Sequence, residues 1–201
     1  MKKIFGVAIA YFTLMTTVLG DEWPAPKALH IFSEDGQYFV RIVPGDTTRN
    51  AGDPSAAHPG RYAHGEFYVR QRDRSYRLVA DVALQNPINP VSAAVTNKGY
   101  LITFDNWHNA GYGKVVAMYT NRGKVIRAYT LEELYSQAQI LDLPLSASSR
   151  WWRCSLAGGF GEPSKVTIFE HLGGLFSFEV EKGTFEYHAG NGKCNALGVS
   201  S

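Results

Sequence analysis

The segment from Asp105 to Gly113 gathers side chains that can bind a polar ligand. These are the carboxylate of Asp105, the amide of Asn106, the rings of Trp107 and Tyr112, and the imidazole of His108. An aromatic plate flanked by amide and carboxylate groups suits a glycan or a peptide, because both have apolar faces and polar edges. Asn, Asp and Gly also form ordinary turns, so a structural loop with Trp107 folded onto the core is the alternative.

Two adjacent tryptophans, Trp151 and Trp152, supply a second aromatic candidate. Neighbouring residues of an extended strand face opposite sides of a sheet, so one ring is expected in the core and the other outside it. An outer ring would add to a binding surface. We therefore include Trp151 among the candidate binding residues.

The sequence assigns no catalytic residue. Asp105 and His108 have the chemistry of an acid–base pair, but an Asp-x-x-His spacing is too common to identify a site. Ser146–Ser149 lack the Gly-x-Ser-x-Gly elbow of a serine hydrolase. Ala157–Gly161 lacks the Lys and Ser or Thr of a phosphate-binding loop.

The histidines do not form a metal-binding set in the sequence. His58 and His64 lie in a segment rich in Pro, Gly and Ala, residues 50–65, at a spacing that matches no zinc motif. Both are expected to be solvated loop residues. We therefore predict no metal and no cofactor.

Cys154 and Cys194 are the only two cysteines, which favours a disulfide in an oxidising compartment. A catalytic thiol or a metal site is the alternative, but His188 alone does not complete a ligand set. Closing a loop of about forty residues stabilises a fold by about 4 kcal/mol in the chain-entropy model.

Residues 1–20 have the pattern of a cleavable signal peptide. Lys2 and Lys3 form a positive start, Ile4–Gly20 carries no charge, and acidic residues and a proline follow. Cleavage is expected after Gly20. A retained membrane anchor is the alternative, although the uncharged run is near the lower limit for a membrane span. Cleavage predicts a periplasmic or secreted protein with no stable membrane span.

Loss of this leader also changes the charge. The chain has 20 Lys and Arg against 18 Asp and Glu, and removing Lys2 and Lys3 leaves 18 of each sign. Nucleic-acid binding needs a basic field that replaces counterions. A nucleic-acid partner is therefore not expected.

The elements that must position these residues are short strands separated by turns. Ser33–Ile42 has the pattern of a tight glycine turn that leads through an aromatic residue into a strand, and Thr96–Phe104 repeats this pattern. Further strands are expected over residues 66–71, 76–82, 114–120, 124–129, 150–156, 165–170 and 175–180. Thr130 and Glu133 form a capping box, which predicts a short helix over residues 131–139.

An all-β fold of repeated four-strand antiparallel meanders follows from this spacing. The repeats are expected at about residues 28–86, 91–139 and 145–190, in one β domain over residues 21–201. The turn, glycine and aromatic pattern resembles the blade-type repeats of β-propeller-like exported bacterial proteins that are uncharacterised. This resemblance implies architecture only and carries no site residues. Three units do not close a propeller ring, so we expect an open stack, a β-sandwich or half of a dimeric assembly.

Three functions remain open from the sequence. The first is an exported, non-enzymatic binding protein whose target is a protein or a glycan of the cell envelope. The second is an envelope hydrolase with a carboxylate pair, or Asp105 with His108, in a cleft. The third is an envelope structural subunit that associates with itself through exposed sheet edges.

Overall fold

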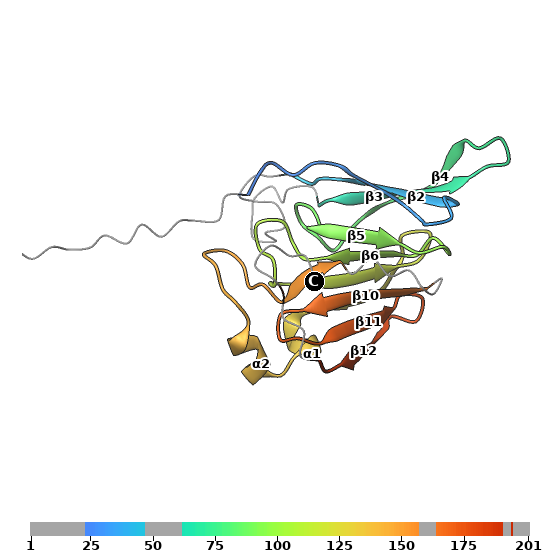
Figure 1. Ribbon diagram of the computed structural model, residues 1–201. Coiled ribbons are helices and arrows are strands. Elements are labelled where there is room, and N and C mark those ends of the chain that lie inside the picture. The colour runs from blue at the N-terminus through green and yellow to red at the C-terminus, as the bar shows by residue number, and fades with distance from the viewer. Residues whose placement is uncertain (1–22, 47–61, 157–163, 191–193, 195–201) are drawn as a thin grey trace, which may run out of the picture.

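Three four-stranded antiparallel sheets form the body of the protein in the computed structural model, which describes residues 23–46, 62–156, 164–190 and 194 (Figure 1). The first sheet contains β1 (Leu29–Phe32), β2 (Tyr38–Val43), β3 (His64–Arg70) and β4 (Tyr76–Ala83). The second contains β5 (Ser92–Val95), β6 (Leu101–Phe104), β7 (Val116–Tyr119) and β8 (Val125–Tyr129). The third contains β9 (Arg153–Leu156), β10 (Lys165–Glu170), β11 (Leu175–Glu179) and β12 (Thr184–His188).

In every sheet the strands pair in chain order, which confirms the predicted all-β fold of repeated meanders. Strands β1, β5 and β12 were not individually predicted. They have four or five residues each and lie at sheet edges, where alternation between buried and exposed positions is short or incomplete. The predicted signal peptide and His58 lie outside the described residues.

The predicted glycine turns are present at both copies of the repeat. Gly36 and Gly99 have φ values of 65° and 80°, a region that glycine enters without a Cβ penalty. Each amide donates to the carbonyl three residues earlier, Ser33 or Thr96.

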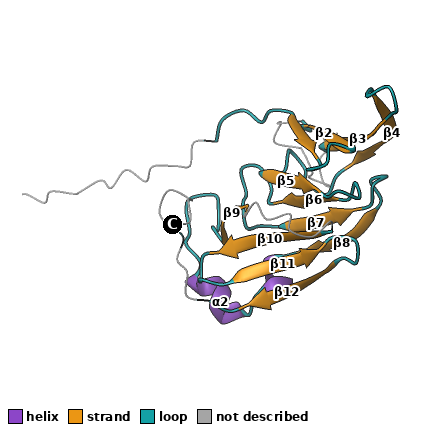
Figure 2. Cartoon of the chain, turned by 45° about the vertical axis from the view of Figure 1, so that its right-hand side comes forward, coloured by secondary structure: helices purple, strands orange, loops and turns teal. Residues whose placement is uncertain are grey.

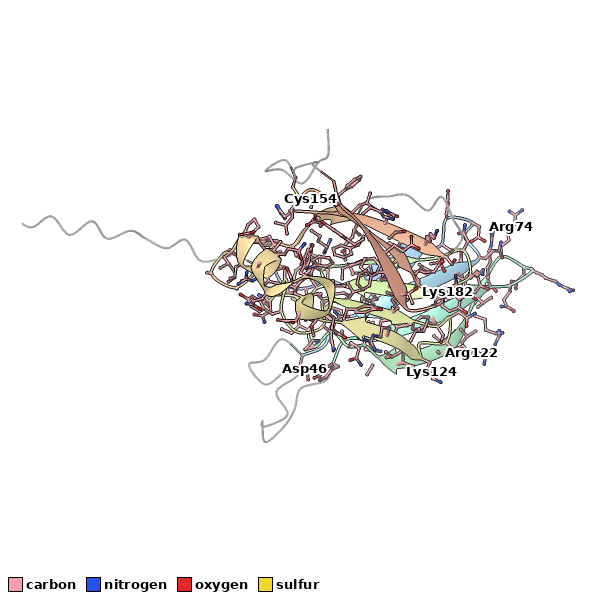
Figure 3. The ribbon with its side chains drawn as sticks, turned by 90° about the horizontal axis from the view of Figure 1, so that it is seen from below. Asp46, Arg74, Arg122, Lys124, Cys154 and Lys182 are labelled. Atoms are coloured by element: carbon pink, nitrogen blue, oxygen red, sulfur yellow. A yellow bond between two sulfur atoms is a disulfide. The ribbon has the colours of Figure 1, made fainter. Side chains whose placement is uncertain are left out.

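Figure 3 shows that Arg74, Arg122 and Lys182, one from the last turn of each sheet, lie at one end of the molecule and Asp46 at the other.

Two hydrophobic cores hold the sheets in a stack with β5–β8 in the middle. Val40, Ile42 and Phe67 pack against one face of the middle sheet, and Phe176 and Phe178 pack against the other. Strands β6 and β7 are consequently buried at every position, whereas β2 and β10 alternate. Within the described residues the sheets stack and do not close into a barrel.

Two short helices replace the single helix predicted over residues 131–139. They are α1 (Leu131–Leu134) and α2 (Gln137–Asp142), and they lie beside the third sheet (Figure 2). The predicted bond of the Thr130 amide to Glu133 is present at 2.9 Å. Tyr135 ends α1 with an extended backbone because its ring enters the core, and Ser136 then starts α2.

A disulfide joins Cys154 to Cys194, with the two Cα atoms 5.3 Å apart, as the sequence predicted. This bond ties the chain beyond β12 back to β9, the edge strand at the opposite side of the same sheet. None of the described helices has the length and apolar character of a membrane span.

Candidate functional site

The β6–β7 connection, residues 105–115, forms the centre of the candidate site. Its first residue, Asp105, is 2% exposed and has a φ of 59°. Its Oδ1 accepts hydrogen bonds from the Gly111 amide at 3.0 Å and from Trp152 Nε1 at 2.7 Å. Its Oδ2 accepts from Arg153 Nε at 2.6 Å. Asp105 therefore fixes the loop to the start of the third sheet.

Asn106 joins the start of the loop to its far end and to Asn86. Its Nδ2 donates to the Tyr112 carbonyl at 2.7 Å, and its Oδ1 accepts from Asn86 Nδ2 at 3.2 Å. Asn86 is fully buried and also donates to the Asp105 carbonyl at 2.7 Å. The polar groups of Asp105 and Asn106, which the sequence placed among the binding candidates, are thus occupied by contacts within the protein.

The rings of Trp107 and His108 meet an aromatic residue from the start of the described chain, Trp23. The Trp107 ring lies 5.2 Å from Trp23, edge to face, and the His108 ring lies 5.9 Å away. His108 has a φ of 70°, which turns the backbone sharply at this position. Both residues are partly exposed.

Trp151 and Trp152 separate as predicted, one inside and one outside, but they lie just before β9 and not on the strand that was predicted over residues 150–156. Trp152 is 1% exposed and packs in the core, whereas Trp151 is 36% exposed. The Trp151 ring is parallel to Trp23, with an interplanar angle of 8° and centroids 6.1 Å apart. We call the cluster of Trp107, His108 and Trp151, which packs around the Trp23 ring, the aromatic site.

A cavity of about 150 Å³ adjoins the aromatic site. Asp105, Arg150, Trp151 and Arg153 contribute to its lining. The charge of Arg153 is balanced by Asp105, and Arg150 donates through Nη1 to the Ile140 carbonyl. The cavity therefore has an aromatic wall, and the two arginines in its lining are engaged with groups of the protein.

The structure thus brings three of the predicted candidates together: Trp107, His108 and Trp151. Tyr112 is 45% exposed, and within the described residues its ring makes no contact with the cluster. Sequence reasoning missed Trp23, which it used only as a flank of the signal peptide. The available signal was an aromatic residue next to two prolines, Trp23-Pro24-Ala25-Pro26.

The geometry of a hydrolase does not form around Asp105. Asp105 and His108 share no hydrogen bond in the part of the chain that the structure describes, and both Asp105 oxygens already accept from other groups. Glu170, the other buried carboxylate among the described residues, accepts from two backbone amides, Leu172 and Gly174, and from two tyrosine hydroxyls. Each carboxylate therefore serves to hold its loop.

His64 is not the solvated loop residue that its Pro- and Gly-rich surroundings suggested. It is the first residue of β3, is 9% exposed, and its Nδ1 lies 2.6 Å from Asp81 Oδ1 on the neighbouring strand. A hydrogen-bonding partner on β4 makes its burial possible.

His64 and Asp81 also lie near Glu66, with one ligand atom of each within 4.8 Å of the others. Tyr68 donates to Glu66 at 2.7 Å, and Arg41 lies 3.1 Å from the same carboxylate. The Tyr68 hydrogen bond, with help from Arg41, holds the pKa of Glu66 below its usual range. The residue types are those of a metal site, but the Glu66 carboxylate already pairs with Arg41 and the His64 imidazole with Asp81.

Comparisons with known proteins identify no family for this chain. No family model matches it, and no curated protein matches it. Among solved structures it is similar to a chain in the crystal structure of Saccharomyces cerevisiae Sqt1, with 14% sequence identity and a TM-score of 0.37. The match covers 78% of this chain and 48% of that chain, so this chain spans about half the length of its neighbour.

Proposed function

We propose that this chain is an exported, non-enzymatic binding protein that recognises a partner protein of the cell envelope through the aromatic site. Export to the periplasm or beyond is supported by the pattern of residues 1–20 and by the disulfide, a bond typical of oxidising compartments.

One observation carries the proposal: Trp107, His108 and Trp151 converge on a single ring at the surface. Tryptophan and tyrosine are enriched in protein interfaces because they bury a large area at low entropic cost. The loop that presents these rings is held by Asp105 and Asn106, so it is ordered before a partner arrives.

A protein partner fits these contacts better than a glycan. The amide and carboxylate groups that would bind sugar hydroxyls, those of Asn106 and Asp105, already bond to the loop and to Arg153. The groups that remain at the surface are the faces of the aromatic rings, because the indole N–H groups of Trp23, Trp107 and Trp151 also donate within the chain.

Recovery of binding partners from envelope extracts tests the proposal. Replacing Trp107 and His108 together by Ala should abolish recovery and leave the melting temperature nearly unchanged, because both side chains are partly exposed. Phe169→Ala, at an aromatic residue that is 41% exposed on β10, is the matched control and should recover the partner normally. Equal recovery by all three proteins would overturn the proposal, and capture by purified envelope glycan in place of protein would reassign the target.

Self-association is a second candidate function, supported by the outer face of the first sheet. Phe32 is 53% exposed and stacks on Phe39 at 4.5 Å, and Tyr68 and Tyr76 extend this ladder. An aromatic face that no described element covers is a potential contact surface for another copy. Sedimentation across a range of concentrations tests this function, since Phe32→Ser would weaken any association through this face.

A further inference from the structure

Residues 23–28 lead from the aromatic site into β1 and have no helix or strand of their own. Three hydrogen bonds fix the segment to the domain. Trp23 Nε1 donates to Ser148 Oγ at 3.3 Å, Trp107 Nε1 donates to the Pro24 carbonyl at 3.0 Å, and Asn89 Nδ2 donates to the Lys27 carbonyl at 3.2 Å. These bonds span 125, 83 and 62 positions of sequence, so the segment is docked by tertiary contacts.

The chemistry of this docking is that of peptide recognition. Pro24 and Pro26 restrict the residues before them, Trp23 and Ala25, to extended or polyproline conformations. Proline-rich segments bind grooves lined with aromatic rings, because the backbone is ordered in advance and its carbonyls are free to accept hydrogen bonds. Here Trp107 supplies both a ring against Trp23 and an N–H to the Pro24 carbonyl.

The Trp23 side chain contacts the other two residues of the site, His108 and Trp151. Its ring stacks on Trp151 and contacts His108, and the ring is half-buried while Pro24 and Ala25 remain exposed. The anchor of the segment is therefore the aromatic ring. The proline backbone that follows determines the direction in which the segment leaves the site.

We infer that the aromatic site binds an extended partner segment in which an aromatic residue precedes proline, and that residues 23–28 occupy the site in the free protein. This inference rests on the proposed function and specifies its ligand. A partner segment of the same chemistry would displace Trp23 from between Trp107 and Trp151. Binding in trans is then opposed by the tethered segment, whose effective concentration is in the millimolar range for a short connection.

The test uses the mature chain and a fluorescently labelled synthetic peptide of sequence WPAPKA, which copies residues 23–28. Fluorescence anisotropy should show that Trp23→Ala binds the peptide at least about tenfold more tightly than the wild type, because the competing ring is gone. Adding Trp151→Ala to Trp23→Ala should remove this binding. Adding Trp107→Phe, which keeps a ring and removes the N–H donor, should weaken it.

Two controls distinguish recognition of the aromatic ring from nonspecific binding of the peptide. A peptide of sequence APAPKA lacks the anchor and should bind no protein, and Trp23→Ala with Phe169→Ala should bind WPAPKA like Trp23→Ala alone. The inference is overturned if wild type and Trp23→Ala bind WPAPKA equally, if neither binds it, or if APAPKA binds as well. If any of these results occurs while partner recovery still depends on Trp107, the proposed function survives. Partner recovery that does not depend on Trp107 and His108 would overturn both the inference and the proposed function.

Discussion

Replacing Asp105 by Asn tests whether a buried ion pair holds the candidate site to the core. The side chains of Asp105 and Arg153 are 3% and 10% exposed, and they are 2.6 Å apart. Asn fits the same volume and tolerates the φ of 59°, so the substitution changes the charge and leaves the backbone unstrained. It also replaces one acceptor oxygen by an N–H₂ group, which faces the Arg153 or Trp152 donor.

The expected loss of unfolding free energy is about 3–5 kcal/mol, the range for removing one partner of a buried pair. For a chain of this length, that loss lowers the melting temperature by about 6–20 °C. Urea unfolding at constant pH with the disulfide intact measures the change, and an unchanged m-value shows that the unfolded state is the same.

Glu181→Gln is the matched control, because Glu181 and Lys98 also lie 2.6 Å apart but at the surface, with exposed fractions of 39% and 49%. Its unfolding free energy should be unchanged within error. If Asp105→Asn loses less than about 1 kcal/mol, Asp105 is not a buried anchor of the kind described above. In that case its role at the aromatic site must be reconsidered.

Three further predictions follow from other parts of the fold. Cys154→Ser should lower the unfolding free energy by about 4 kcal/mol in urea titrations, because a loop of 40 residues is released; equal midpoints for oxidised wild type and the variant would contradict this. Burial lowers the pKa of His171 below 6.5, so the unfolded chain takes up its proton first as the pH falls, and stability is lost below about pH 6.5. His171→Gln should therefore show a smaller drop in melting temperature from about pH 7 to about pH 5 than the wild type, and an equal drop would refute this cause. Gly36→Ala should cost about 1–2 kcal/mol through its positive φ. Gly99→Ala should cost about 1–3 kcal/mol more in the same titration, because a Cβ there collides with the Tyr38 ring, whereas a Cβ at Gly36 makes only ordinary van der Waals contacts.

Local chemistry made most of the fold predictable. Glycine at the turns of Ser33–Ile42 and Thr96–Phe104 permits the positive φ that each turn requires, and β2, which follows the first turn, alternates between buried and half-buried positions. The Thr130–Glu133 capping box was likewise predictable, since it involves neighbours in sequence. The end of α1 was not predictable, because it depends on the packing of Tyr135 in a core that other elements complete.

The candidate site was only partly predictable for the same reason. Trp107, His108 and Trp151 could be recognised by residue type, but Trp23 gains its role through its own bond to Ser148, 125 positions away, and through the bond of Pro24 to Trp107, 83 positions away. The role of Asp105 as an anchor depends on Arg153, 48 positions away. His64 was misassigned because local composition indicated a loop, whereas its partner Asp81 lies on the next strand.

The length of the β6–β7 connection itself bears on function. The neighbouring turns of the same sheet, residues 96–100 and 120–124, reverse the chain with a glycine turn. Residues 105–115 are a longer connection, and fixing each additional residue costs about 1–2 kcal/mol of conformational entropy. Asp105, Asn106 and Asn86 offset that cost with buried hydrogen bonds, so the loop is ordered without any need for its outward rings. Trp107 and His108 are therefore the residues at which binding can be lost while folding is kept, whereas a change at Asp105 would affect both.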